Sequence, residues 1–60
     1  MSATAKLKSA LRAIDDARTA LRRAKGNADS DDEYQIRKAI SELDDAERYI
    51  KRAINEVPSD

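Results

Sequence analysis

The sequence predicts an all-α protein: an antiparallel two-helix hairpin that pairs with a second copy to form a four-helix bundle. Three observations lead to this prediction. Apolar residues recur every seven positions in both halves of the chain, the single Gly lies near the middle, and the single Pro lies near the end. An apolar repeat sustained over three heptads or more is typical of helices that pack side by side at a shallow angle.

The first helix is expected over residues 3–25. Large aliphatic residues occupy one position of its heptad, and alanines occupy a second position. The two series are Leu7, Ile14 and Leu21, and Ala3, Ala10, Ala17 and Ala24. This spacing places both series on one face of a helix, which is therefore the face expected to pack against the second helix.

A turn is expected over residues 26–30, because the two heptad series do not join. The second series of large residues begins 29 positions after the first, which is one more than four heptads. Lys25 and Gly26 are typical of a helix C-terminus, where a cation meets the negative end of the helix dipole and a glycine adopts the left-handed conformation. Ser30 and Glu33 match the capping box that begins a helix.

The second helix is expected over residues 31–56, followed by a short tail at 57–60. Its large residues are Ile36, Leu43, Ile50 and Val57, and its alanines are Ala39, Ala46 and Ala53. Pro58 should end this helix, because proline has no backbone N–H to donate and disfavours helical backbone at the preceding residue.

The two helices are expected to pack as an antiparallel coiled coil in which every layer pairs one large residue with one alanine. A loop of about five residues is short enough to make them neighbours, and alternating large and small side chains let the layers interdigitate. Seven pairs whose residue numbers sum to 60 satisfy this condition: Ala3–Val57, Leu7–Ala53, Ala10–Ile50, Ile14–Ala46, Ala17–Leu43, Leu21–Ala39 and Ala24–Ile36.

Apolar residues outside this seam predict a homodimer. Leu11, Ile40 and Ile54 share one heptad position and are expected to form an apolar flank on one side of the hairpin. Tyr49, on the other flank, extends the candidate oligomer interface. Exposed apolar surface on a small domain is a common sign of association, and a chain of this size usually needs association or cross-links for stability. The alternative is that a different protein covers the apolar flank.

The residue composition argues against an enzyme. The chain has no His and no Cys, so it lacks the most common general base, the most common metal ligand and the thiol nucleophile. The acidic run at 29–33 does not match a calcium-binding loop and is interpreted as helix capping. We therefore expect no catalytic residue, no metal site, no cofactor and no small-molecule substrate.

The charges are divided unequally between the two halves of the chain. Residues 1–28 carry a net charge of +5 and residues 29–60 a net charge of −5, although the whole chain is formally neutral. Local ion pairs are expected one helical turn apart, at Arg12–Asp16, Glu33–Arg37 and Glu47–Lys51. The basic first helix also makes nucleic acid a candidate partner. The possible contacts are Arg12, Arg18, Arg22, Arg23 and Lys25.

The expected function is that of a small non-catalytic structural or protein–protein interaction module. The architecture resembles that of the Rop family of plasmid RNA-binding regulators, whose short chains form two helices and dimerise into a four-helix bundle. The resemblance covers chain length and topology and no residue motif, and it implies RNA binding by one helical face as an alternative function. A second alternative is an adaptor or inhibitor that presents its apolar flank to a larger protein.

The sequence also gives an expectation about location. No apolar run approaches the length that spans a bilayer, and the N-terminal residues lack the apolar core of a signal peptide. We therefore expect a cytoplasmic protein without a membrane partner.

Overall fold

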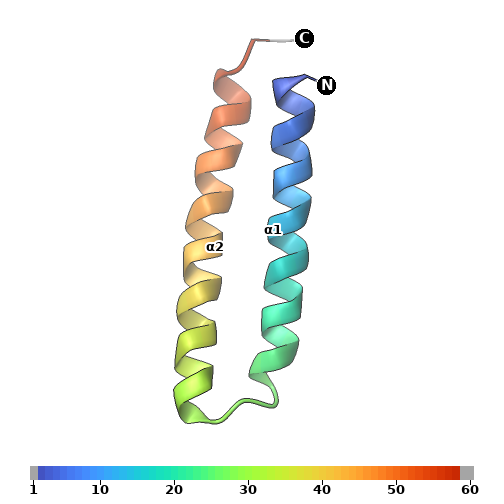
Figure 1. Ribbon diagram of the computed structural model, residues 1–60. Coiled ribbons are helices and arrows are strands. Elements are labelled where there is room, and N and C mark those ends of the chain that lie inside the picture. Colours follow the sequence, from blue (N-terminus) through green and yellow to red (C-terminus); the bar gives the residue numbers. More distant parts are fainter. Residues whose placement is uncertain (1, 59–60) are drawn as a thin grey trace.

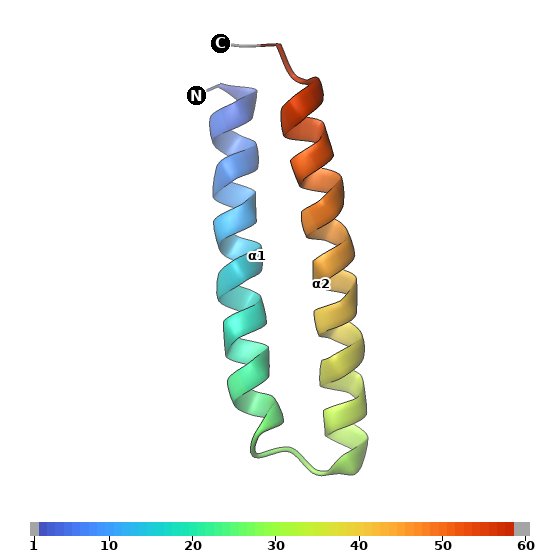
Figure 2. The same cartoon turned by 180° about the vertical axis from the view of Figure 1, so that it is seen from behind.

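Two antiparallel helices account for the fold of residues 2–58, the part of the chain that the structure describes. The computed structural model has α1 at Ala3–Lys25 and α2 at Ser30–Glu56. The two helices lie side by side, so that α1 begins at the same end of the molecule at which α2 ends (Figure 1). The view from behind shows the same pairing (Figure 2). The Cα atoms extend over 46 × 16 × 10 Å, so the molecule is a rod only one helix thick.

The all-helical hairpin predicted from the heptads is confirmed. The first helix has the predicted bounds, and the second begins at Ser30, one residue earlier than predicted. Its last residue is Glu56, as predicted. Residues 59 and 60 of the predicted tail lie outside the described residues.

Asp29, not Ser30, caps the N-terminus of α2. The backbone of Asp29 is extended, with φ −74° and ψ 178°, and its carboxylate accepts a hydrogen bond from the backbone N–H of Asp32 at 2.9 Å. The prediction that Ser30 and Glu33 form a capping box is therefore wrong, and Ser30 is the first residue inside the helix. An aspartate cap is as favourable as a serine cap and also places a negative charge at the positive end of the helix dipole.

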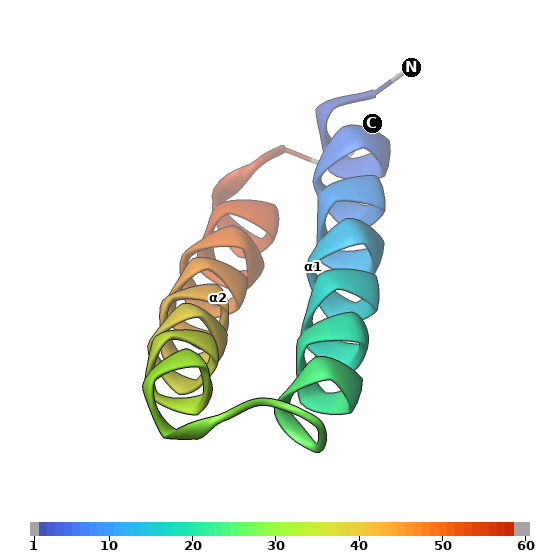
Figure 3. The same cartoon turned by 60° about the horizontal axis from the view of Figure 1, so that its bottom comes forward.

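The left-handed conformation predicted for Gly26 is wrong. Gly26 has φ −63° and ψ −20°, and no residue of the described chain has a positive φ. Instead, the helix tightens at its end: the N–H groups of Gly26, Asn27 and Ala28 each donate to the carbonyl three residues earlier, at 3.3, 3.1 and 3.3 Å. These bonds satisfy the last carbonyl groups of α1 without a left-handed residue. Figure 3 shows the loop that then crosses to α2.

Helix α2 ends at Glu56, as predicted, and its C-cap Val57 is the residue before the proline. Val57 is extended, with φ −79° and ψ 132°, and its N–H donates to the carbonyl of Ala53 at 3.1 Å. Extended backbone at Val57 is the conformation that a following proline favours.

The hairpin seam differs from the predicted seam on the side of α1. The large aliphatic residues of both heptad series are half-buried, as predicted, but three alanines that should face them are exposed: Ala3, Ala17 and Ala24. The positions one residue later are half-buried in their place, namely Thr4, Arg18 and Lys25, and in the remaining heptad Ala10 and Leu11 are both half-buried. The prediction of seven large-to-alanine layers is therefore wrong for three layers.

A physical reason for this rotation of α1 lies in the size and charge of the residues that it turns inward. A buried leucine removes more apolar surface from water than a buried alanine. A rotation that turns Leu11 toward α2 and Ala17 toward water therefore buries more apolar surface than the predicted seam. The same rotation brings Arg18 within reach of carboxylates on α2. If Ala17 faced α2 instead, Asp44 and Glu47 would lack this cation.

Candidate functional site

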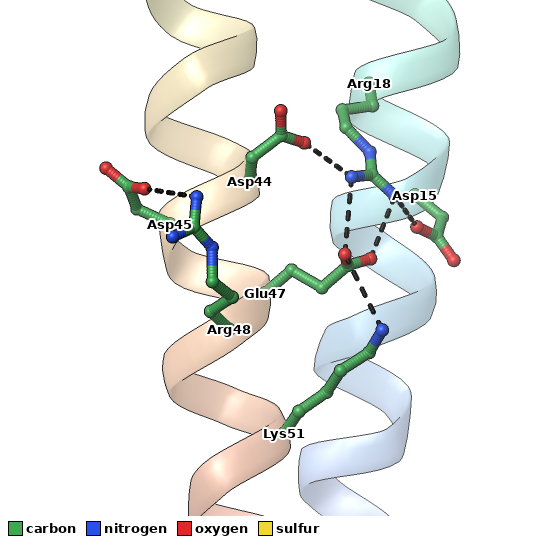
Figure 4. A network of polar contacts seen from close by, with 7 residues as sticks. All are labelled: Asp15, Arg18, Asp44, Asp45, Glu47, Arg48 and Lys51. Atoms are coloured by element: carbon green, nitrogen blue, oxygen red, sulfur yellow. Dashed lines mark hydrogen bonds and ion pairs between the residues drawn. The ribbon is translucent and has the colours of Figure 1, made fainter.

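A cluster of charged residues joins the two helices near the middle of the rod (Figure 4). The guanidinium of Arg18 on α1 lies 2.5 Å from Asp15 on the same helix, 2.6 Å from Asp44 on α2 and 2.9 Å from Glu47 on α2. The Arg18 side chain is only 17% exposed. We refer to Arg18, Asp15, Asp44 and Glu47 as the Arg18 cluster.

Helix geometry explains why these groups converge. Asp15 precedes Arg18 by three residues, and Asp44 precedes Glu47 by three residues, so each pair lies on one flank of its helix. The antiparallel arrangement then brings the two flanks together. Lys51 approaches Glu47 at 3.7 Å, one turn further along α2, and extends the cluster toward the end of the rod.

Hydrogen bonds to Asp44, then to Asp15, and to Glu47 raise the pKa of Arg18 above its ordinary value, while partial burial acts in the opposite direction. The guanidinium therefore stays charged, and its charge is shared among three carboxylates. The Nε atom of Arg18 is covered and has no hydrogen-bond partner in the described part of the chain. The two terminal nitrogens of the guanidinium are bound to carboxylates of both helices, which fits a role in holding the helices together.

The Arg18 cluster identifies the two sides of the hairpin. Positions seven residues apart share one flank of a packed helix. Asp15 therefore shares its flank with Lys8 and Arg22, and Asp44 shares its flank with Arg37 and Lys51. We call this flank, together with the adjoining heptad positions of Arg12, Lys25 and Arg48, the basic side of the hairpin.

The opposite side of the hairpin is rich in alanine, and we call it the alanine face. On α1 it comprises Ala10, Ala13, Ala17, Ala20 and Ala24, all of which except Ala10 are exposed. On α2 it comprises the half-buried Ala39, Ala46 and Ala53, together with Tyr49. The Tyr49 side chain is 67% exposed and is one of the two large apolar residues of the described chain that remain open to water.

The residues predicted as an oligomer interface fall into two groups. Leu11 shares its heptad position with Arg18, and Ile40 and Ile54 share theirs with Glu47. All three are half-buried, so the hairpin itself already covers much of their surface. Tyr49 lies on the alanine face and is open. A role of these residues in a dimer stays a prediction.

The five residues predicted as nucleic-acid contacts differ in their position and in their ion pairs. Arg12, Arg22 and Lys25 lie toward the basic side, where Arg12 and Arg22 are exposed and Lys25 is half-buried. Arg18 is bound to its three carboxylates. Arg23 is exposed on the outer surface of α1, facing away from α2. The structure therefore brings four of the five together on one side, and three of these four make no ion pair within residues 2–58.

Two of the three predicted local ion pairs are confirmed. Arg37 lies 3.5 Å from Glu33, and Lys51 lies 3.7 Å from Glu47. Within residues 2–58 no ion pair joins Arg12 to Asp16, whereas an unpredicted pair joins Arg48 to Asp45 at 3.2 Å. Sequence reasoning missed the Arg18 cluster, although Arg18 stands seven residues from Leu11 and could have been recognised as a polar member of the buried series.

Other types of site have little support in the geometry. Among the described residues no group of three His, Cys, Asp or Glu side chains is placed to hold a metal ion. A shallow hollow of about 70 Å³ lies on the outer surface of α2, lined by Asp45, Arg48, Tyr49 and Arg52. Pockets for small molecules are several times larger. In the described chain, neither helix has a stretch long and apolar enough to cross a membrane.

Comparisons with protein-family models, with curated proteins and with solved structures find no match to this chain. The resemblance to Rop therefore rests on chain length and helix topology alone.

Proposed function

We propose that this chain is a non-catalytic structural and interaction module that pairs with a second copy of itself to form a four-helix bundle. The observation that carries this proposal is the absence of any fully buried residue in the range 2–58. A single pair of helices covers only one face of each helix, so every large side chain of the seam keeps part of its surface in water.

The exposed area supports the same conclusion. The hairpin exposes 4680 Å², whereas a compact monomer of this mass would expose about 3,900 Å². The excess of roughly 800 Å² is close to what one partner contributes to a stable interface. A second copy that covered this much surface would give the hairpin the exposure of an ordinary compact protein.

The alanine face is the surface best suited to a second copy. Small side chains let helices approach closely, and Tyr49 supplies a large, exposed aromatic group beside them. Lys6 on α1 and Glu42 and Glu56 on α2 edge this face. A two-fold arrangement that lays α1 on α2 of the second copy therefore brings opposite charges together.

Replacing an alanine on this face tests the proposal. Ala17→Glu places a carboxylate on the alanine face, and Thr19→Glu places the same carboxylate on an exposed position outside it. We expect the melting temperature of the parent to rise with protein concentration, because association stabilises the folded state by mass action. The Ala17→Glu variant should lose this dependence and stay helical at low temperature, and Thr19→Glu should keep it.

Two results would contradict the proposal. A parent whose melting temperature is independent of concentration is a monomer, which would favour the adaptor function, with another protein covering the apolar surface. A parent that depends on concentration, with an Ala17→Glu variant that behaves identically, would place the interface elsewhere, and Leu11, Ile40 and Ile54 would then be the next candidates.

A further inference from the structure

We propose that the basic side of the hairpin is a binding surface for the phosphate backbone of a nucleic acid. This surface includes cations of both helices: Lys8, Arg12, Arg22 and Lys25 on α1, and Arg37, Arg48 and Lys51 on α2. It lies opposite the alanine face, so a monomer and a dimer present it equally, and the inference does not depend on self-association.

Pairing within the molecule makes this side positive although the chain is neutral. Five carboxylates lie on the basic side or beside its cations, and each of them is already in an ion pair. Asp15, Asp44 and Glu47 are bound to Arg18, and the remaining two are Glu33, bound to Arg37, and Asp45, bound to Arg48. Counting Arg18, eight cations stand against five carboxylates on this side.

Four of these cations make no ion pair within residues 2–58. They are Lys8, Arg12, Arg22 and Lys25, and all come from α1. Asp16, the remaining carboxylate of α1, lies beyond Arg12 on the outer surface of the helix and makes no ion pair with it. These four cations are therefore the groups of the basic side that are free to receive an anion.

The spacing of the cations favours an extended anion. Arg18 meets both Asp44 and Glu47 across the seam, which fixes the relative heights of the two helices. From this pairing and the rise per residue, Lys8 and Arg12 are expected at about the level of Arg48 and Lys51, and Arg22 and Lys25 at about the level of Arg37. The two groups are separated by about 20 Å along the helix axis, at 1.5 Å per residue. A single phosphate group cannot reach both, whereas a nucleic-acid backbone presents charges along the whole distance.

Two further features favour nucleic acid over a lipid surface. Among residues 2–58 the basic side exposes no large aliphatic side chain to enter a bilayer, and its one large exposed apolar residue is Tyr34, at 65% exposure. Tyrosine can stack on an unpaired base. The opposite face does not cancel the positive potential, because the diameter of a helix exceeds the screening length of about 8 Å at physiological salt.

Fluorescence anisotropy with matched variants tests this inference. The probes are a labelled RNA duplex, the DNA duplex of the same sequence and a single-stranded RNA, each titrated at several salt concentrations. Arg12→Gln with Arg22→Gln removes two unpaired cations from the basic side. Arg23→Gln with Arg52→Gln removes the same charge from the outer surfaces and is the matched control.

We expect the parent to bind at least one probe with an affinity that falls steeply with salt. The basic-side variant should bind about tenfold or more weakly, with a salt slope lower by about two, and the control should bind like the parent. The Ala17→Glu variant should still bind, which separates this surface from the dimer interface.

Three results would overturn the inference. These are no binding to any probe at low salt, an equal loss of affinity in the control variant, and binding to phosphatidylserine vesicles without binding to nucleic acid. Circular dichroism of each variant shows whether the helices are intact, so that a loss of binding is not mistaken for unfolding.

Discussion

Arg18 is the residue on which the internal arrangement of the hairpin depends most. It shares its half-buried heptad position with Leu11 and Lys25, beside the seam residues Ile14 and Leu21, and it meets carboxylates from both helices. A polar group within an apolar seam can select one register and one orientation of the helices, as polar seam residues do in coiled coils. We expect the Arg18 cluster to serve this purpose here.

Removal of the cation should destabilise the hairpin. In Arg18→Met the stem of the side chain is retained, but Asp44 and Glu47 lose their shared partner. We expect a clear fall in melting temperature, compared with a change of at most about 3 °C for Arg23→Met, which alters an exposed arginine. A second change, Glu47→Leu, should recover part of the loss in the Arg18→Met background. Equal melting temperatures for Arg18→Met and Arg23→Met would show that the cluster contributes nothing.

The pH dependence of this loss follows from the raised pKa of Arg18. A group whose pKa is higher in the folded state contributes stability that is fully present below its unfolded pKa and is lost as the pH rises through the folded value. The ordinary pKa of an arginine already lies far above neutral pH, and that of Arg18 is raised further. The difference in melting temperature between parent and Arg18→Met should therefore stay constant between about pH 7 and about pH 10. A difference that shrinks over this range would contradict the assignment.

The cluster shows where residue-level prediction from sequence is limited. The repeat identifies Leu7, Ile14 and Leu21 as seam residues, because large aliphatic side chains have no better place than a packed face. It does not reveal how far each helix turns about its axis. That rotation depends on cross-helix partners, such as Asp44 and Glu47 for Arg18, which lie far apart in the sequence and meet only once the hairpin has formed.

At the scale of whole elements, the ends of the helices follow local chemistry. The end of α2 was predictable because Pro58 acts on the preceding backbone. The end of α1 lies at the predicted residue, although Gly26 does not adopt the left-handed conformation on which that prediction depended. The identity of the cap on α2 was less predictable, since Asp29 and Ser30 are both good capping residues and adjacent in the chain. Only the backbone geometry shows that Asp29 is the cap.

Substitution of the two candidate caps distinguishes them. Asp29→Ala removes the acceptor of the hydrogen bond from the Asp32 N–H, and should cost about 1 kcal/mol of stability. Ser30→Ala, inside the helix, should cost little, because alanine is the better helix former. Denaturant unfolding of both variants at one protein concentration checks the order. A larger loss for Ser30→Ala would restore the capping box predicted from the sequence.

The loop offers a second test at this scale. Gly26 has right-handed helical backbone angles, and a Cβ added there would lie 3.5 Å from the carbonyl oxygen of Arg23, which is an ordinary contact. Gly26→Ala should therefore stabilise the protein by about 0.5–1 kcal/mol, because alanine restricts the unfolded chain. Thermal unfolding should show a higher melting temperature. A lower one would indicate that Gly26 adopts the left-handed conformation in solution.

At the scale of the whole molecule, the hairpin has two unlike sides. The alanine face is neutral at its centre and nearly smooth apart from Tyr49, and the basic side carries cations whose neighbouring carboxylates are already paired. This division follows from the rotation of α1 that turns Leu11 and Arg18 inward and Ala17 outward. The heptad repeat predicts the hairpin. It also predicts an apolar flank of Leu11, Ile40 and Ile54 for a partner, whereas in the structure the hairpin itself half-buries these three residues.

The solution mass of the parent protein, measured by light scattering over a wide concentration range at physiological salt, tests the central claim most directly. Self-association through the alanine face predicts a species of twice 6.7 kDa that dissociates only on dilution. A mass of 6.7 kDa at every concentration, with the helices intact, would contradict it and would show that the exposed surface of the hairpin is left open for a different partner.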